Sequence, residues 1–333
     1  MQAVTCGIAV SLFLLRINEV CVMEKLIISV QTGDWYDDLF GAEAGADEAF
    51  AFIKSCGFDA LDYNLDHTLR PSQVENGECS ALLDKPLEEL LEYYRPVKEA
   101  AEKHGIRFSM AHAPFPSNSA AHPEHNDYVI KSIIKIIYVC GYLRIPNLVV
   151  HPIIRKNRTE EWEMNMQMYP KLIDAARENR VKICLENLFS WHAGHSQRRA
   201  CAEAGEACRY IDTLNEIAGE DIFGFCYDVG HGNILGCNIY EDLKQLGHRL
   251  TTLHIHDNDG RMDLHCIPYT IKNSCKNTTD WEGFTQGLKE IGYEGPLNFE
   301  IFAALKEVPR PLVPEMLKFI HKIGEYFRDY ISK

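Results

Sequence analysis

Six acidic or imidazole residues end short apolar segments of this 333-residue chain. In each segment the apolar side chains share one parity and the polar residue takes the other, as in LVVH, where Leu148 and Val150 oppose His151. The residues in this position are His112, His151, Glu186, Asp228, His256 and Glu300. Carboxylates and imidazoles bind divalent metals and transfer protons, so these segments point to metal-assisted or acid/base chemistry.

If these six side chains lie close together, a bound cation would best compensate their burial. Buried carboxylates and imidazoles are unfavourable unless a metal or hydrogen bonds compensate them. Each residue taken alone is better explained as a satisfied core or rim group. Together, on six segments, they predict a divalent metal site.

The elements that carry these residues alternate between two kinds. Eight β-type segments are followed by longer helical ones, among them 46–57, 126–141, 160–180 and 280–292, with a bend expected at Pro96 inside 86–105. The eight predicted strands are 26–32, 58–64, 106–112, 147–151, 181–187, 222–228, 250–256 and 296–301. This order predicts a single (β/α)8 TIM barrel, with the polar residues at the carboxyl ends of its strands, where barrel active sites lie.

The rival architecture is an open, doubly wound sheet. Such a sheet normally carries a glycine-rich phosphate loop after an early strand, and the sequence contains neither GxGxxG nor GxxxxGK[ST]. No linker-like composition divides the chain after residue 23, which favours one domain over 23–333.

The first 22 residues stand apart from this pattern. Positions 3–15 (AVTCGIAVSLFLL) resemble the apolar part of a signal peptide, but no Lys or Arg precedes them and no A-x-A site follows. We expect residues 1–22 to be a non-native upstream extension. A signal or anchor, and a packed segment, are the alternatives, although the run is short for a bilayer span.

Composition narrows the partners and the compartment. The 34 Lys and Arg against 48 Asp and Glu give a net charge of -14, so nucleic acid is disfavoured and a membrane is not expected. One local exception is the run Gln197, Arg198 and Arg199. Twelve cysteines without a CxxC pair are typical of reduced thiols and indicate a cytoplasmic protein.

The motifs at the strand ends resemble those of a known superfamily. MAHAPF, VVHP, CLEN, YDVGH, HIHDNDG, the pair Asp263 and His265, and the final FEI follow the order of the xylose isomerase-like barrels, over residues 25–325. This superfamily includes sugar isomerases and epimerases, inosose-processing enzymes and endonuclease IV-type repair enzymes. The resemblance is informative about fold and metal, and less so about substrate.

Similarity to the sugar epimerases implies one divalent metal, which would be Mn, Co, Mg or Zn. The ligands it implies are Glu186, Asp228, His256 and Glu300, with Glu186 and Glu300 also as the catalytic acid/base pair. His231 and Arg261 would contact the substrate. A metal that polarises a ketose carbonyl makes the adjacent C–H acidic, so one glutamate could remove that proton and the other return it through an enediolate.

Similarity to endonuclease IV implies a different number of metal ions at the same strand ends. That enzyme type holds three zinc ions with nine ligands, and each has a counterpart here. The five beyond the epimerase set are His112, His151, His231, Asp263 and His265, which would be additional metal ligands or would contact the ligands. Several sugar-type relatives keep the histidines at the third and fourth strand ends, here His112 and His151, as groups that contact substrate or the ligands, so the full set does not by itself imply three metals. A zinc phosphoester hydrolase acting on abasic DNA is therefore the alternative to the isomerase, and a non-catalytic sugar or metal sensor is a third reading.

Aromatic and polar residues near other strand ends complete the expected site. Trp35 and Phe115 could stack on a sugar ring, although such residues also serve as packing. Asp62 and Asn64 take inward parity on the second strand, and Asp280 is a good N-cap before Trp281. We expect a metal-dependent isomerase or epimerase of a small sugar, keto-sugar or cyclitol; a homo-oligomer is compatible with the sequence.

Overall fold

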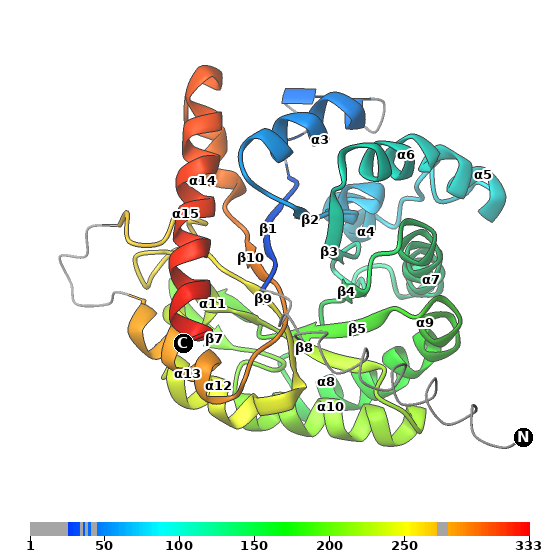
Figure 1. The fold of residues 1–333 in the computed structure, drawn as a ribbon. Coiled ribbons are helices and arrows are strands. Elements are labelled where there is room, and N and C mark those ends of the chain that lie inside the picture. Colours follow the sequence, from blue (N-terminus) through cyan, green and yellow to red (C-terminus); the bar gives the residue numbers. More distant parts are fainter. Residues whose placement is uncertain (1–25, 34–35, 37–38, 41–44, 272–278) are drawn as a thin grey trace, which may run out of the picture.

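A (β/α)8 barrel forms the body of the molecule, with its strands at the centre and its helices around them (Figure 1). The computed structural model describes residues 26–33, 36, 39–40, 45–271 and 279–333. The expected extension over residues 1–22 and the expected sugar-stacking residue Trp35 lie outside the described residues.

All eight predicted strands are present and pair in parallel. In chain order they are β1 (Ile28–Gln31), β2 (Ala60–Asp62), β3 (Arg107–His112), β4 (Asn147–Val149), β5 (Lys182–Glu186), β8 (Phe223–Asp228), β9 (Leu250–His254) and β10 (Leu297–Phe299). The sheet order is β10-β1-β2-β3-β4-β5-β8-β9. A parallel bridge between Ile255 and Phe299 joins β9 to β10, so the sheet returns on itself and the barrel prediction is confirmed.

Helices follow the strands and cover the outside of the barrel. They are α3 (Ala46–Ser55), α4 (Pro71–Asn76), α5 (Leu87–Tyr93), α6 (Arg95–His104), α7 (Asn126–Leu143), α8 (Arg158–Met168), α9 (Ile173–Asn179), α10 (Ala204–Ala218), α11 (Val229–Ile234), α12 (Ile239–Leu246), α13 (Trp281–Glu290), α14 (Phe302–Lys306) and α15 (Val313–Ile331). The break between α5 and α6 falls at Tyr94, beside the predicted bend at Pro96. None of the described helices is long and apolar enough to cross a membrane.

Side chains point alternately outward and inward along each strand, and this alternation produces two separate apolar layers. Outward residues such as Leu148, Ile183 and Phe225 belong to the main core between strands and helices. Met110, Val149, Cys184 and Cys226 form a separate small cluster inside the barrel. Each of these four lies two residues before a polar strand-end residue, so an apolar layer supports the polar mouth from below.

One element has no counterpart in the sequence prediction. After β5 the chain forms an antiparallel hairpin of β6 (Phe189–His192) and β7 (His195–Arg198). Gly194 turns it with φ +80°. The hairpin is held to the barrel by backbone bonds between Leu188 and residues 199 and 200.

Candidate functional site

A pocket of about 260 Å³ opens at the carboxyl ends of the strands. Its described lining is mostly polar and comprises Gln31, Gly33, Asn64, Asp66, His112, Phe115, His151, Glu186, His231, Asp263, His265, Glu300 and Phe302. Seven of these lining residues were named from the sequence as catalytic or ligand candidates. The strand-end argument therefore locates this pocket, which we call the mouth.

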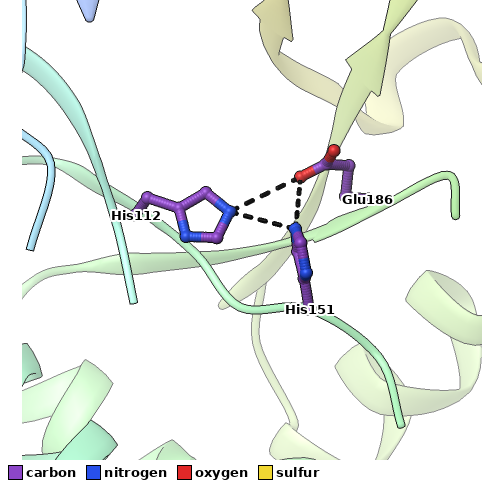
Figure 2. Close-up of side chains that lie close together, drawn as sticks. All are labelled: His112, His151 and Glu186. Atoms are coloured by element: carbon purple, nitrogen blue, oxygen red, sulfur yellow. Dashed lines mark hydrogen bonds and ion pairs between the residues drawn. The ribbon is translucent and has the colours of Figure 1, made fainter. Parts of the chain in front are cut away.

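One corner of the mouth holds two imidazoles and a carboxylate (Figure 2). The Nε2 atoms of His112 and His151 are 3.0 Å apart, and Glu186 Oε2 lies 3.1 Å from His151 Nε2 and 3.8 Å from His112 Nε2. Ligands of one tetrahedral zinc ion, at bonds of about 2.0 Å, lie roughly 3.3 Å apart. The spacing of these three atoms suits a single ion.

A second group forms among residues that end or follow β8 and β9. His231 Nε2 lies 3.4 Å from Asp263 Oδ2, and His265 Nε2 lies 3.2 Å from the same oxygen. His256 stacks on His265 with ring centres 4.0 Å apart, and its Nε2 is 3.0 Å from Asp228 Oδ1. The structure thus brings all five of these residues together.

Three carboxylates meet in the middle, around an imidazole that the sequence argument gave no role. His254 Nδ1 lies 3.3 Å from Glu300 Oε2, 3.5 Å from Glu186 Oε2 and 3.9 Å from Asp228 Oδ2. Among the described residues, Asp228 and Glu300 form a potential metal-holding group with His254, whereas His256 groups with Asp228 and His231 and with Asp263 and His265. The expected set of Glu186, Asp228, His256 and Glu300 is therefore spread over two neighbouring positions.

Backbone carbonyls orient three of the histidines. The Nδ1 atoms of His112, His231 and His265 lie 2.8 to 2.9 Å from the carbonyl oxygens of Ala113, Asn187 and Glu300, respectively. A carbonyl only accepts, so Nδ1 carries the hydrogen and the neutral ring presents its lone pair at Nε2. This arrangement is typical of metal-ligating histidines.

Local backbone structure fixes Asp228 and His256. Asp228 ends β8 and caps α11 by accepting a hydrogen bond from His231 N at 2.7 Å. Asn187 Oδ1 accepts from Asp228 N at 2.7 Å. A Cβ on Gly230 would come within 1.9 Å of His256 Cε1, so only glycine lets α11 approach this imidazole. The DVGH segment is thus built to place three mouth residues at once.

Charge interactions across the mouth are strong. Burial opposes ionisation of Glu186, but His151 and His254 outweigh burial and hold the pKa of Glu186 well below its ordinary value. Burial likewise opposes protonation of His231, yet Asp228 and Asp263 raise its pKa well above the ordinary value. Asp62 lies one layer deeper, where burial raises its pKa to about 6. Glu300 is oriented by Gln31 Nε2, which donates to Oε1 at 2.8 Å.

The described part of the chain fits a divalent cation. Asp263 Oδ1, His256 Nδ1 and both ring nitrogens of His254 are buried without a hydrogen-bond partner. Unpaired buried polar atoms among convergent carboxylates and outward-facing imidazole lone pairs are what a bound cation would satisfy. The mixed oxygen and nitrogen donors suit Mn, Co and Zn, and their carboxylates also suit Mg.

The predicted substrate-contacting residues divide into three cases. His231 and Phe115 line the mouth, with the Phe115 ring 5.0 Å from that of His151. Arg261 is exposed on the loop after β9 and is not among the described residues that line the mouth. Asn64 lines the mouth, whereas Asp62 is bonded to Asn298 Nδ2 at 2.9 Å below it.

Sequence reasoning missed His254 and the hairpin residue Phe189. The alternation of LHIH does give His254 inward parity, which is the signal that could have found it. Phe189 stands edge-on to His231 with ring centres 4.9 Å apart, and no periodic pattern marks it.

Fold and site together define a (β/α)8 barrel whose polar mouth gathers acids and imidazoles at the carboxyl ends of its strands. A sequence model described as "Xylose isomerase-like TIM barrel" matches residues 50–323, and the chain belongs to this family. An uncharacterized protein of Sinorhizobium fredii, y4fM, is 25% identical over 290 residues, covering 80% of this chain and 82% of that protein. Another uncharacterized protein, MJ1311 of Methanocaldococcus jannaschii, is 26% identical over 202 residues, covering 57% and 63%.

The fold of this chain is also similar to those of several solved structures. The 3-keto-D-glucoside 4-epimerase YcjR of E. coli has a TM-score of 0.63 at 17% identity, over 90% of this chain and all (100%) of that one. An L-ribulose 3-epimerase has a TM-score of 0.64 at 13% identity, over 92% and 95%. D-psicose 3-epimerase, solved in the presence of D-fructose, gives 0.62 at 13% identity, over 91% and 99%.

Proposed function

We propose that this protein is a divalent-metal-dependent isomerase or epimerase of a small sugar, keto-sugar or cyclitol derivative. The observation that carries the proposal is the pair of buried carboxylates, Glu186 and Glu300, which line one small pocket and approach the same imidazole nitrogen at 3.5 and 3.3 Å. The epimerases of similar fold lend support.

The cation has a defined set of protein donors. Glu186, Asp228 and Glu300 would hold it, with His254 and His256 as the neighbouring imidazoles. When bound, a divalent ion polarises a substrate carbonyl and makes the adjacent C–H more acidic.

The proton transfers belong to the two glutamates. Glu186 is kept ionised by His151 and His254, so it can act as the base that removes a proton from carbon. Glu300, oriented by Gln31, returns a proton to the neighbouring carbon or to the opposite face. Phe115 and Phe302 give the pocket apolar walls that reduce access of water to the reacting carbons.

The first prediction tests the acid/base pair. Wild-type protein loaded with Mn²⁺ or Co²⁺ is incubated in D₂O with a panel of ketoses and keto-glycosides, and deuterium on carbon is measured by mass spectrometry. We expect Glu186→Gln and Glu300→Gln each to slow incorporation about 10²- to 10⁴-fold. Glu160→Gln, at an exposed position on α8, is the matched control and should exchange like wild type. Unchanged exchange in both glutamine variants would contradict the mechanism.

One observation favours a second function. Four overlapping groups that could hold a metal contain all nine of the expected donors: His112, His151 and Glu186; Asp228, His231 and His256; His256, Asp263 and His265; and Asp228, His254 and Glu300. A phosphoester hydrolase of the endonuclease IV type, with three zinc ions, would use such a set. Cleavage of a duplex containing an abasic site, with about three zinc ions per chain and no deuterium exchange into sugars, would favour this function.

A further inference from the structure

A second cavity, of about 440 Å³, lies where the start of α8, strand β7 and the start of α10 meet. Its lining is Arg158, Arg198, Arg199, Glu203, Gly205, Glu206 and Arg209, and it shares no residue with the mouth. Pockets that bind small molecules have volumes of roughly 300–1,000 Å³. We call this space the arginine cavity.

The charge of the arginine cavity opposes that of the whole chain. Four arginines and two glutamates line it, so four positive charges less two negative leave a formal +2 in a chain of -14. Positive charge concentrated in a concave site attracts anions locally even when the net charge repels them.

One of the four arginines has a structural role. Arg158 contacts the buried Glu161 and also Glu206, and so ties α8 to α10, which lie next to each other in Figure 1. Arg198 has a weaker arrangement: its guanidinium donates to Leu235 O at 3.0 Å and stands 3.7 Å from Glu203. Arg158 is therefore neutralised, and Arg198 only in part.

The other two have neutral partners. Arg199 donates to Ser190 Oγ at 2.5 Å and to Gln197 Oε1 at 3.0 Å. Arg209 stands 4.3 Å above the ring of Trp162. Within the described residues neither guanidinium has a carboxylate within 4.0 Å, and each keeps N–H donors beyond those contacts.

The backbone adds positive character at the same place. α8 begins at Arg158 and α10 at Ala204, so two helix N-termini face the ring of arginines. Asn157 already accepts hydrogen bonds from Thr159 N and Glu160 N at the start of α8, so there the helix dipole rather than free N–H groups favours an anion. Arginine forks match the geometry of phosphate oxygens.

We propose that the arginine cavity binds the phosphoryl group of a small phosphorylated molecule through Arg198, Arg199 and Arg209. An open cavity of this size suits one phosphoryl group, whereas a duplex backbone needs a long continuous basic stripe, which a net charge of -14 disfavours. The inference does not depend on the proposed function, because binding alone tests it.

The segment of residues 188–199 contacts both the arginine cavity and the mouth. Arg199 N donates to Leu188 O at 3.1 Å, two residues after Glu186, and its side chain bonds Ser190, the neighbour of Phe189. The Phe189 ring contacts His231 in the mouth. An anion bound to Arg199 would therefore lie next to the segment whose Phe189 packs against His231.

Isothermal calorimetry at low ionic strength tests the proposal with D-glucose 6-phosphate, inorganic phosphate and D-glucose on metal-loaded full-length protein. We expect the two phosphates to bind wild type, and Arg199→Gln/Arg209→Gln to weaken binding about 10- to 100-fold. The control is Arg95→Gln. Arg95 is an exposed residue of α6 that pairs with Glu92 and Glu99, and its variant should bind phosphate like wild type. Equal affinities for the two phosphates would identify a phosphate site without sugar selectivity.

Conservative variants separate folding from recognition. Arg199→Lys/Arg209→Lys keeps the charge and loses the fork, so an intermediate affinity is expected, with melting temperatures of all variants checked alongside. No phosphate binding to wild type would overturn the proposal. So would phosphate affinity unchanged in the double glutamine variant, which would place the anion at the mouth.

Discussion

His254 occupies the point at which three acidic side chains meet, and it is only 1% exposed. Burial opposes its protonation, but Cys226, Glu300 and Glu186 outweigh burial and raise the pKa of His254 well above the ordinary value. An imidazole here offsets the mutual repulsion of the carboxylates. We infer that the protonated imidazole stabilises the arrangement of Glu186 and Glu300 when no cation is bound, and that the deprotonated ring is available to a cation.

Replacement of this imidazole gives the second prediction. We expect His254→Leu, close in size but without ring nitrogens, to lower metal affinity about 10- to 100-fold. Competition with a fluorescent chelator measures the effect. His321→Leu is the control, because His321 packs edge-on against Phe58 and takes no part in the mouth. Metal affinity unchanged in His254→Leu would remove His254 from the site.

The strand-end residues could be predicted because a single parity rule governs them. One polar residue in an otherwise apolar alternation must face the barrel interior, and parallel strands bring their carboxyl ends to one edge. The division of ligands between His254 and His256 could not be predicted, since both have inward parity. Only the end of β9 at His254 separates them, and strand ends are poorly defined by sequence.

At the level of elements, helix α13 depends on the residue that caps its N-terminus. Asp280 accepts a hydrogen bond from Gly283 N at 2.8 Å, which confirms the N-cap expected from the sequence. We predict that Asp280→Ala lowers the free energy of unfolding by about 1 kcal/mol, whereas Asp280→Asn keeps the acceptor and loses much less. Urea unfolding followed by circular dichroism compares the two. Equal midpoints for both variants would show that the cap does not limit stability.

The eight strands could be predicted because each is apolar, short and bounded by turn residues. The β6–β7 hairpin could not, since FSWH and HSQR have little apolar alternation and are half-buried or exposed. Its position comes from backbone bonds to Leu188 and from contact of Phe189 with His231, which are tertiary interactions. Such contacts cannot be predicted from the local sequence.

For the whole molecule, metal removal should lower stability. A ligand that binds only the folded protein adds about 2.7 kcal/mol at a concentration 100 times its Kd. We predict that EDTA lowers the melting temperature by about 5 °C or more, and that added Mn²⁺, Co²⁺ or Zn²⁺ restores it. EDTA saturated with calcium is the control, measured by calorimetry together with metal content. An unchanged melting temperature in protein shown to lose its metal would contradict a structural contribution of the ion.

The closure of the barrel has a consequence for biosynthesis. β1 pairs with β10, and Gln31 donates to Glu300 across 269 positions of sequence. While the chain leaves the ribosome, β1 therefore has no partner on one side until residue 299 is available, and Glu300 arrives after every other donor of the mouth. The donor set is therefore complete only after residue 300 has been synthesised, so a chain released earlier would present an open sheet edge without a complete site.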